Sequence, residues 1–496
     1  MWGTPDGHTT NQVLTFVASP AKSPPKTHIP PPKSASMPYL YNTPEDVAEM
    51  LTAIGAKSID ELFEMVPEDL RFKRPLNLPA AQGEMELEGT LRAMAARSTG
   101  VGTKVCFLGG GAYDHFIPAV IDTVAGRSEF YTSYTPYQPE VSQGNLQAMF
   151  EFQSLMTRIT GLDVSNSSLY DGGSAAAEGV LMALHGSSRD GRVVVAESVH
   201  PEYRSAIATY LANLGVEIVT VPTPGGVVDV KQLAAEITPQ TACVVLQQPN
   251  FFGCLEDADA ICQAAHDAGA LVVAAFDPIS TGILKRPGDY GADIAIAEGQ
   301  NLGSPLAYGG PYLGIIACRE SLVRRMPGRI VGRTTDRRGK PCYTLTLQTR
   351  EQHIRREKAT SNVCSNQALF ALRATVYLSL LGPQGLRDTA ELCLQKSRYL
   401  ADELAATDRF ELAFDAPTFK EFVVRDREGK VDELIAHGLT AGMLIGVPLG
   451  NWYPDLADCL LIAVTEKRTR AELDALVKCL TAKPARTREK PLAATR

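Results

Sequence analysis

The sequence has no excess of positive charge, because 56 Asp and Glu residues outnumber 48 Lys and Arg residues, for a formal net charge of −8. Such a chain has no overall positive field that would gather nucleic acid or anionic lipid. Long apolar runs are also missing, since no stretch approaches the roughly 18 uninterrupted residues of a membrane-spanning helix. The sequence therefore predicts a protein that binds neither nucleic acid nor membrane.

Closely paired cysteines are absent too. The 10 cysteines are scattered from Cys106 to Cys479 without a C-x-x-C pair, and most lie in apolar runs. This pattern favours buried, reduced thiols in a cytoplasmic protein over a disulfide framework or a zinc site. We therefore expect no bound metal.

Both ends of the chain differ in composition from the rest. Residues 1–36 contain proline clusters, no arginine and little hydrophobic periodicity, so we expect disorder there. The segment resembles neither an arginine-rich transit peptide nor a secretory signal. A basic tail is expected at residues 483–496.

Between these ends, four regions are predicted in a chain that is 45% hydrophobic and long enough for two cores. A helical region covers residues 37–104 and begins with the capping pattern of Thr43-Pro44-Glu45-Asp46. A large α/β domain at 105–331 follows, then an arginine-rich connecting segment at 332–366. Residues 367–482 are expected to form a smaller α+β domain.

Short apolar runs alternate with helical patterns in the large domain, which is typical of a layered α/β fold with a parallel sheet. The expected strands are Arg192–Glu197, Val216–Val221, Cys243–Leu246, Leu271–Phe276 and Ile294–Ala297. Phe422–Val424 and Leu460–Val464 are strand candidates in the smaller domain.

Polar residues directly after these runs are the candidate site residues, because ligands collect beyond the carboxyl ends of parallel strands. Asp171-Gly172-Gly173-Ser174 opens a helical stretch, where backbone N–H groups can hold an anion or simply cap the helix. His200 is placed to stack on a flat ring or to serve as an ordinary loop residue. Asn250 is similarly ambiguous, and Asp277 is placed to face a pyridinium nitrogen or to form a turn with Pro278.

Together these residues occur in the order expected of a fold-type-I pyridoxal-phosphate domain. Such a domain needs a lysine just after the next strand, because the cofactor aldehyde is held there as a Schiff base. Here that strand is followed by Glu298-Gly299-Gln300, and no lysine occurs between Lys285 and Lys340. The sequence therefore predicts the scaffold of a pyridoxal-phosphate enzyme without its catalytic lysine.

Four longer segments resemble the glycine-cleavage-system P-protein family, and within it the α-type subunit of the split form. The resemblance runs from about Tyr39 to about residue 480 and is carried by Gly109–Val120, Tyr134–Gly144, Glu151–Gly179 and Gln348–Cys364. It implies two homologous halves, with pyridoxal phosphate bound covalently by a lysine-bearing subunit 2. Gln300 then occupies the lysine slot of this half.

The resemblance also implies an activity and its partners. The complete enzyme would decarboxylate glycine and pass the aminomethyl group to the lipoyl arm of the H-protein, in functional linkage with the T- and L-proteins. The implied assembly is a heterotetramer with two copies of each subunit.

Two groups of residues are interpreted as contacts to partners. Tyr113, Asp114, His115, Tyr134, Tyr137 and Gln138 are expected either to reach the partner's active site or to pack the subunit interface. Arg350, His353, Arg355 and Arg356 suit either phosphate or an acidic H-protein, or else salt bridges across the domain junction.

Two competing interpretations remain at this stage. One is a free-standing pyridoxal-phosphate decarboxylase or aminotransferase that recruits Lys285. The other is a non-catalytic scaffold or regulatory subunit that only stabilises its partner.

Overall fold

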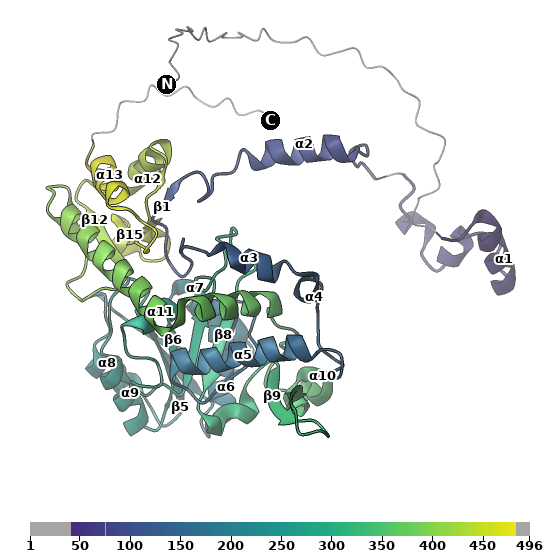
Figure 1. Ribbon diagram of the computed structural model, residues 1–496, viewed down its shortest axis with the longest axis horizontal. Helices are drawn as coiled ribbons and strands as arrows, with labels where there is room; N and C mark the ends of the chain where they lie inside the picture. The colour runs from purple at the N-terminus through teal and green to yellow at the C-terminus, as the bar shows by residue number, and fades with distance from the viewer. Residues whose placement is uncertain (1–40, 75, 483–496) are drawn as a thin grey trace, which may run out of the picture. The chain divides into compact units, whose positions relative to one another are not determined.

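The computed structural model describes residues 41–74 and 76–482 (Figure 1). The predictions for residues 1–36 and 483–496 lie outside these described residues. The chain divides into two units, residues 1–92 and 93–496, which are described separately here. None of the helices in the described part of the chain is long and apolar enough to cross a membrane.

The regular structure in the described part of the first unit is helical. Helix α1 (Pro44–Ile54) begins with a capping box in which Thr43 and Asp46 bond each other's backbone N–H, and Pro44 starts the first turn. The short helices η1 (Asp60–Phe63) and η2 (Glu68–Leu70) follow, and α2 (Glu84–Ala95) begins in this unit. No described residue of the unit is buried.

A seven-stranded sheet dominates the second unit, in the order β2-β8-β7-β6-β5-β3-β4. The strands β4, β3, β5, β6 and β7 are mutually parallel, whereas β8 runs antiparallel to both of its neighbours. Their bounds are β2 (Val164–Ser165), β3 (Arg192–Ala196), β4 (Glu217–Val221), β5 (Thr241–Gln248), β6 (Leu271–Phe276), β7 (Ile294–Glu298) and β8 (Gly314–Cys318). All five predicted strands of this domain are confirmed, and β2 and β8 are additional.

The sheet is buried on both faces, which explains its nearly continuous apolar strands. In β7, Ile294 and Ile296 belong to one apolar core, and the alternate residues Ala295 and Ala297 belong to another. The first core includes α6 (Gly172–Gly186), α7 (Pro201–Leu211), α8 (Val230–Glu236) and α9 (Ala258–Asp267). The second includes α3 (Ala119–Ala125), α5 (Gln143–Thr160) and the first half of α11 (Ala368–Ala405).

A smaller, antiparallel sheet lies in the stretch for which a C-terminal α+β domain is predicted. Its four strands are β11 (Phe410–Leu412), β12 (Glu421–Asp426), β15 (Cys459–Ala463) and β14 (Val447–Pro448), in that order. It packs with α12 (Val431–Thr440), α13 (Arg470–Thr481) and the second half of α11. The helix α11 links both cores, and it kinks at Gly382, which has a φ of 60° and precedes Pro383.

The remaining elements are short. β1 (Val105–Cys106) pairs with β13 (Met443–Leu444), and α4 (Ser128–Tyr131) precedes α5. The arginine-dense segment forms a hairpin of β9 (Ile330–Thr335) and β10 (Pro341–Thr346), followed by η5 (Gln348–Arg350), α10 (Gln352–Arg355) and η6 (Arg356–Lys358). Single turns also occur at η3 (Pro278–Gly282), η4 (Glu320–Arg325), η7 (Leu449–Asn451) and η8 (Pro454–Leu456).

The cysteines are all free thiols, and all but Cys342 and Cys364 are buried. This arrangement agrees with the prediction of reduced, buried thiols.

Candidate functional site

Two neighbouring cavities lie at the carboxyl ends of the parallel strands, where the sequence predicts a site. One has a volume of about 30 Å³ and includes Asp277 and Lys420 in its lining. The other, of about 610 Å³, includes Asp171 and Ser174 in its lining, and His200 lines both cavities. The smaller cavity has room for little more than one water molecule.

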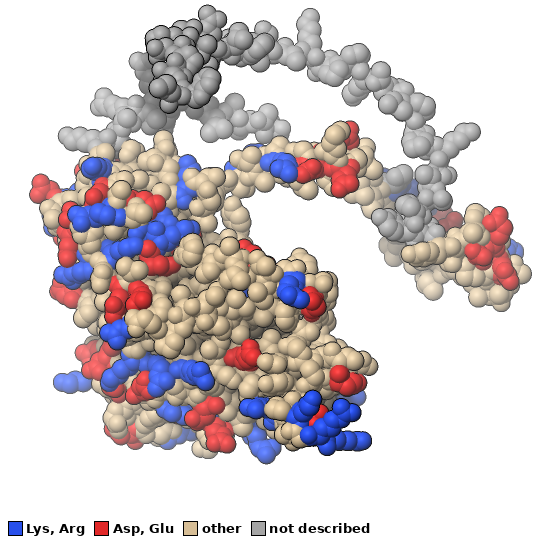
Figure 2. Space-filling model, viewed as in Figure 1, with Lys and Arg blue, Asp and Glu red and all other residues tan. Residues whose placement is uncertain are grey.

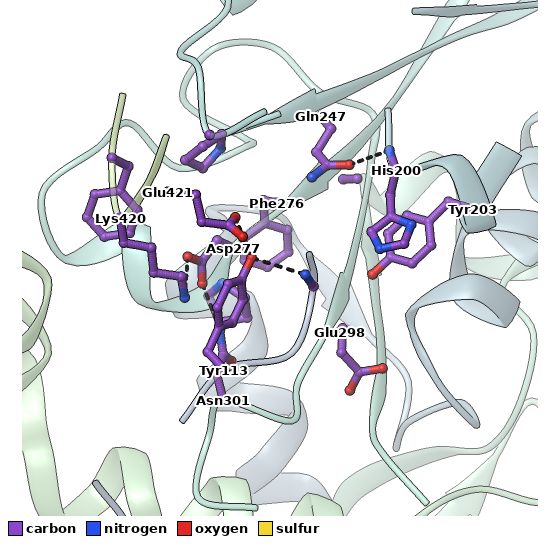
Figure 3. A pocket seen from close by; sticks show the side chains of 16 residues that line it. Tyr113, His200, Tyr203, Gln247, Phe276, Asp277, Glu298, Asn301, Lys420 and Glu421 are labelled. Carbon is purple, nitrogen blue, oxygen red and sulfur yellow. Dashed lines mark hydrogen bonds and ion pairs between the residues drawn. The ribbon is translucent and has the colours of Figure 1, made fainter. Parts of the chain in front are cut away.

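Asp277 follows β6 directly, and each oxygen of its carboxylate lies close to a polar group of the same chain (Figure 3). Its Oδ2 forms an ion pair with Lys420 Nζ at 2.7 Å, while its Oδ1 accepts from Asn301 Nδ2 at 2.8 Å and from the Ile279 N–H at 3.1 Å. Lys420 precedes β12 and is only 1% exposed, so the pair joins the two sheets away from water. The candidate pyridinium partner is therefore already neutralised by a cation of the same chain.

Lys420 lies within a set of buried contacts from the segment after β1. Its Nζ lies 3.4 Å from the centre of the Tyr113 ring and 3.2 Å from Nε2 of His115. On its other side, His115 Nδ1 pairs with Glu466 Oε2 at 2.6 Å, and this partner holds the pKa of Glu466 near 2 against the opposing effect of burial. The contacts bind the segment to the small sheet.

Tyr113 and Asp114 complete this junction. Tyr113 donates its hydroxyl proton to Glu421 Oε2 at 2.8 Å, and burial raises the pKa of Glu421 to about 7. Asp114 pairs with Lys467 at 2.8 Å and with Arg468 at 3.0 Å. Three residues predicted to reach a partner, Tyr113, Asp114 and His115, thus have buried side chains whose bonds are made within this chain.

The start of α6 is the predicted anion-binding turn, and the structure places side-chain carboxylates there. Asp171 caps the helix, with Oδ1 accepting from the Ser174 N–H at 2.7 Å. Glu298 Oε2 accepts from the Gly172 N–H at 2.9 Å, and burial raises the Glu298 pKa to about 7. A Cβ at Gly172 would collide with the Tyr203 hydroxyl, which explains glycine at this close approach. Gly173 also lines the larger cavity.

Gln300 is 1% exposed and has a structural role in this chain. Its Oε1 accepts from the Tyr113 N–H at 2.8 Å, and its Nε2 donates to the Tyr113 carbonyl at 3.1 Å and to the Ser304 carbonyl at 2.7 Å. A lysine in this position could not make the bond from Tyr113 N–H, because an ammonium has no acceptor. The Gln300 amide therefore holds the Tyr113 backbone through both of its polar atoms.

His200 stacks on a ring of its own chain. Its ring centroid lies 4.7 Å from that of Tyr203 with an interplanar angle of 21°. Nδ1 accepts from the Glu202 N–H at 3.1 Å and Nε2 donates to the Gly110 carbonyl at 2.7 Å, while burial lowers the His200 pKa. A neutral imidazole held in one tautomer satisfies both bonds.

Asn250 does not join the other candidates, since it lines neither cavity. Its Nδ2 donates to the Gly226 carbonyl and to Glu256 Oε1, each at 2.7 Å, and its Oδ1 accepts two backbone N–H groups. Five of the seven predicted pocket residues thus line one or both of the cavities, Gly172 lies beside them with its N–H bonded to Glu298, and Asn250 belongs to a loop.

Sequence reasoning missed several residues of the pocket. Glu298 could have been found by the rule that indicates Asp277, because it too lies at the carboxyl end of a parallel strand, at the same edge of the sheet. Lys420 and Glu421 come from the other domain, and no local pattern marks them as pocket residues. Tyr203 lies one helical turn after His200 and would be found only once that helix is placed.

The other predicted partner residues lie on the surface. Tyr134 and Tyr137 are each 74% exposed, and Gln138 is exposed as well. In the described part of the chain, Arg350, Arg355 and Arg356 form no ion pair with a carboxylate, whereas His353 lies 3.8 Å from Glu351. The expectation that this group makes salt bridges across the domain junction is therefore wrong.

The mixed sheet with its small C-terminal domain is the architecture of fold-type-I pyridoxal-phosphate-dependent enzymes. A glutamate decarboxylase structure from Lactobacillus brevis shares this fold with a TM-score of 0.62 at 12% identity, covering 84% of this chain and 95% of that one. A crystal structure of an inhibitor-bound glycine decarboxylase (P-protein) of the glycine cleavage system is 40% identical with a TM-score of 0.80. The match covers 90% of this chain and 99% of the P-protein chain in that structure.

The glycine cleavage system P-protein family model matches residues 37–480. Two relatives named as probable glycine dehydrogenase (decarboxylating) subunit 1 agree with it. The protein from Desulforamulus reducens is 49% identical over 440 residues, which are 89% of this chain and 98% of that protein. The protein from Carboxydothermus hydrogenoformans is 51% identical over 446 residues, which are 90% of this chain and 99% of that protein. The chain belongs to the P-protein family.

Pyridoxal phosphate does not fit this chain's own pocket. Its ring nitrogen would meet Asp277, which Lys420 already neutralises. Its phosphate would meet the Glu298 carboxylate at the start of α6, beside a cavity whose lining contains no lysine or arginine. Its aldehyde would meet the Gln300 amide, which is not a nucleophilic amine.

Proposed function

We propose that this chain is the P-protein subunit that does not carry the cofactor, and that a lysine-bearing subunit 2 binds pyridoxal phosphate covalently. The observation that carries this proposal is Gln300 in the lysine slot, with both polar atoms of its amide bonded to the Tyr113 backbone. The Lys420–Asp277 ion pair supports it independently, because the pocket charge is balanced without a cofactor.

The reaction proposed for the assembled pair is the decarboxylation of glycine, followed by transfer of the aminomethyl group to the lipoyl arm of the H-protein. The relatives named as glycine dehydrogenase (decarboxylating) subunit 1 support this activity. The T- and L-proteins would then process the loaded arm. The proposed assembly has two copies of each subunit and is cytoplasmic.

The contribution of this chain to the partner's site is proposed to come from the loop before α5. Tyr134 and Tyr137 present two exposed phenol rings and Gln138 an exposed amide, and no side-chain bond to the rest of the described chain holds these three residues. Exposed tyrosines are well suited to an interface, because each combines a large apolar surface with one hydrogen-bonding hydroxyl. Shielding the partner's reacting groups from water is the role we assign to this loop.

Glycine-dependent exchange of labelled bicarbonate tests the proposal. The assay contains lipoylated H-protein and either this chain alone, the partner alone or an equimolar mixture. We expect exchange from the mixture and none from this chain. Exchange catalysed by this chain alone would contradict the argument from Gln300.

The free-standing alternative is disfavoured by the position of Lys285, whose ammonium pairs with Asp259 at 2.8 Å on the exposed surface. Lys420 lies in the pocket, but its ammonium occupies the pyridinium side rather than the aldehyde side. Borohydride reduction of the isolated chain with pyridoxal phosphate, followed by peptide mapping, is expected to label neither lysine. If this chain is only a scaffold, bicarbonate exchange by the mixed subunits should be unaffected when Tyr134→Phe and Tyr137→Phe are combined.

A further inference from the structure

A third cavity, of about 490 Å³, lies at the opposite end of α6 from the pocket described above. His185 and Gly186, at the end of the helix, line it, together with η4 and the segment from η5 to η6. The 15 residues of α6 rise about 1.5 Å each, which separates the two ends by about 22 Å. The cavity is therefore distinct from the edge of the sheet that carries Asp277.

Positive charge dominates this cavity. Its charged lining residues are Arg324, Arg325, Arg350, Arg355 and Lys358, and the lining contains no aspartate or glutamate. Figure 2 shows further Lys and Arg side chains gathered at the lower right, over the hairpin of β9 and β10 that precedes the lining segment from η5 to η6. Such a concentration is unexpected in a chain whose net charge is −8.

Four of these cations have no partner in the described chain. Arg324, Arg325, Arg355 and Lys358 are exposed at the cavity, and their side chains form no hydrogen bond or ion pair with the described residues. Cations at a helix C-terminus stabilise its dipole, but this effect acts only within the last turn. Four unpaired cations around one hollow exceed what the end of α6 requires.

Arg350 also lines the cavity and is less exposed than its other cations. Its guanidinium donates to the carbonyls of Leu347, Met326 and Gly328, and burial lowers its pKa. No carboxylate pairs with it, although Glu351 acts on its charge from outside the lining. A partly desolvated positive charge without a counterion attracts an anion more strongly than a solvated surface arginine does.

The backbone around Arg350 is also unusual. Leu347, which lines the cavity, has a φ of 52°, and Arg356, next to the lining residue Arg355, has a φ of 56°. Residues with a Cβ seldom adopt this left-handed region, and such outliers cluster at ligand-binding sites. The two outliers turn the chain so that Arg350, Arg355 and Lys358 face one hollow.

We propose that this cavity binds a small anion carrying two or more phosphoryl groups. Guanidinium groups match phosphoryl oxygens in charge and in hydrogen-bond geometry, and the hydroxyls of Ser321, Thr349 and Thr360 line the same space. A single phosphate dianion would leave most of the positive charge uncompensated, whereas a diphosphate brings three or more negative charges. A hollow of this volume also suits a small ligand better than a flat protein face.

Isothermal titration of the full chain with inorganic pyrophosphate tests the proposal. The pocket variant is Arg324→Gln/Arg355→Gln, and the matched control is Arg337→Gln/Arg338→Gln in the hairpin between β9 and β10, outside the lining. We expect the pocket variant to bind at least tenfold more weakly and the control to bind as the unaltered chain does. Both variants are expected to keep the melting temperature, because the replaced side chains are exposed.

Three results would overturn the proposal: no binding of pyrophosphate, equal affinity of the pocket variant, or equal weakening in both variants, which indicates diffuse charge attraction. Binding of an acidic protein without binding of pyrophosphate would overturn it too.

Repeating the titration on the assembled complex separates two sources of the phosphoryl groups. Retained binding indicates a free ligand, whereas binding by the isolated chain alone indicates groups supplied by the partner. The titration involves no catalysis, so its outcome is independent of the function proposed above.

Discussion

Replacing Lys420 by methionine should destabilise the chain strongly, although the site has no catalytic role assigned to it. The change removes the ammonium that pairs with Asp277 and keeps most of the apolar stem. The two side chains are only 1% and 10% exposed, so Asp277 would be left as a buried charge without its counterion. Removing one partner of a buried pair costs about 3–5 kcal/mol.

This free energy converts into a measurable shift of the melting temperature. A unit of roughly 400 residues, with an unfolding entropy of about 2.1 cal/mol/K per residue, has a total near 0.8 kcal/mol/K. The expected decrease in Tm is therefore about 4–6 °C. Thermal unfolding of the full chain, followed by circular dichroism at neutral pH, measures it directly.

Two further variants make the test specific. Lys285→Met removes an ion pair whose side chains are 64% and 58% exposed, and it should change the Tm by about 1 °C or less. Lys420→Met combined with Asp277→Asn removes both charges, so its Tm should lie well above the value expected from adding the single effects. Equal shifts for Lys420→Met and Lys285→Met, or additive single effects, would refute the assignment of a buried ion pair.

Three more predictions concern Gln300, Tyr137 and Glu178. Gln300→Lys alone should give no borohydride-reducible adduct with pyridoxal phosphate, because Lys420 and Glu298 still oppose the cofactor; a labelled peptide containing residue 300 would contradict this. Tyr137→Ala should lower bicarbonate exchange by the mixed subunits without changing the Tm of this chain, since the side chain is 74% exposed; unchanged exchange would remove Tyr137 from the partner's site. Burial raises the pKa of Glu178 to about 7 from 4.5, so this carboxyl favours the folded state at low pH and loses that contribution as the pH rises through 7. Glu178→Gln should therefore raise the Tm by up to about 4 °C at pH 8, and hardly at pH 4.5, by differential scanning fluorimetry; an equal shift at both pH values would count against the raised pKa.

The strands of the large domain could be predicted because each of them is apolar on both faces. Ile294–Ala297, for example, faces two different cores through alternate residues, and only a strand buried in a layered sheet combines such shortness with such apolarity. β2 and β8 escaped prediction for different reasons. β2 spans only Val164–Ser165, and β8 (Gly314–Cys318) follows a glycine-rich loop without a helix between it and β7.

The sequence also indicates only some residues of the candidate site, namely those that a local pattern marks. Asp171, His200 and Asp277 could be found because each directly follows or opens an element at one edge of the sheet. The partners of these side chains could not be found, since Lys420 and Glu421 arrive from the other sheet. Tyr113, Asp114 and His115 were selected for a partner's site, yet their side-chain bonds are made at the junction between this chain's own sheets.

The presence of Asp277 shows why retained pocket residues do not by themselves indicate a retained cofactor. A buried aspartate in an empty pyridoxal-phosphate pocket would be an uncompensated charge, and such a charge is costly to keep. Lys420 compensates it from within the chain, and the amide of Gln300 bonds the Tyr113 backbone. Asp277 therefore has a charged partner within this chain whether or not any ligand binds. The pocket charge of Asp277 is thus balanced within the chain, and the residues proposed to meet other molecules lie elsewhere, in the exposed loop before α5 and in the cationic cavity.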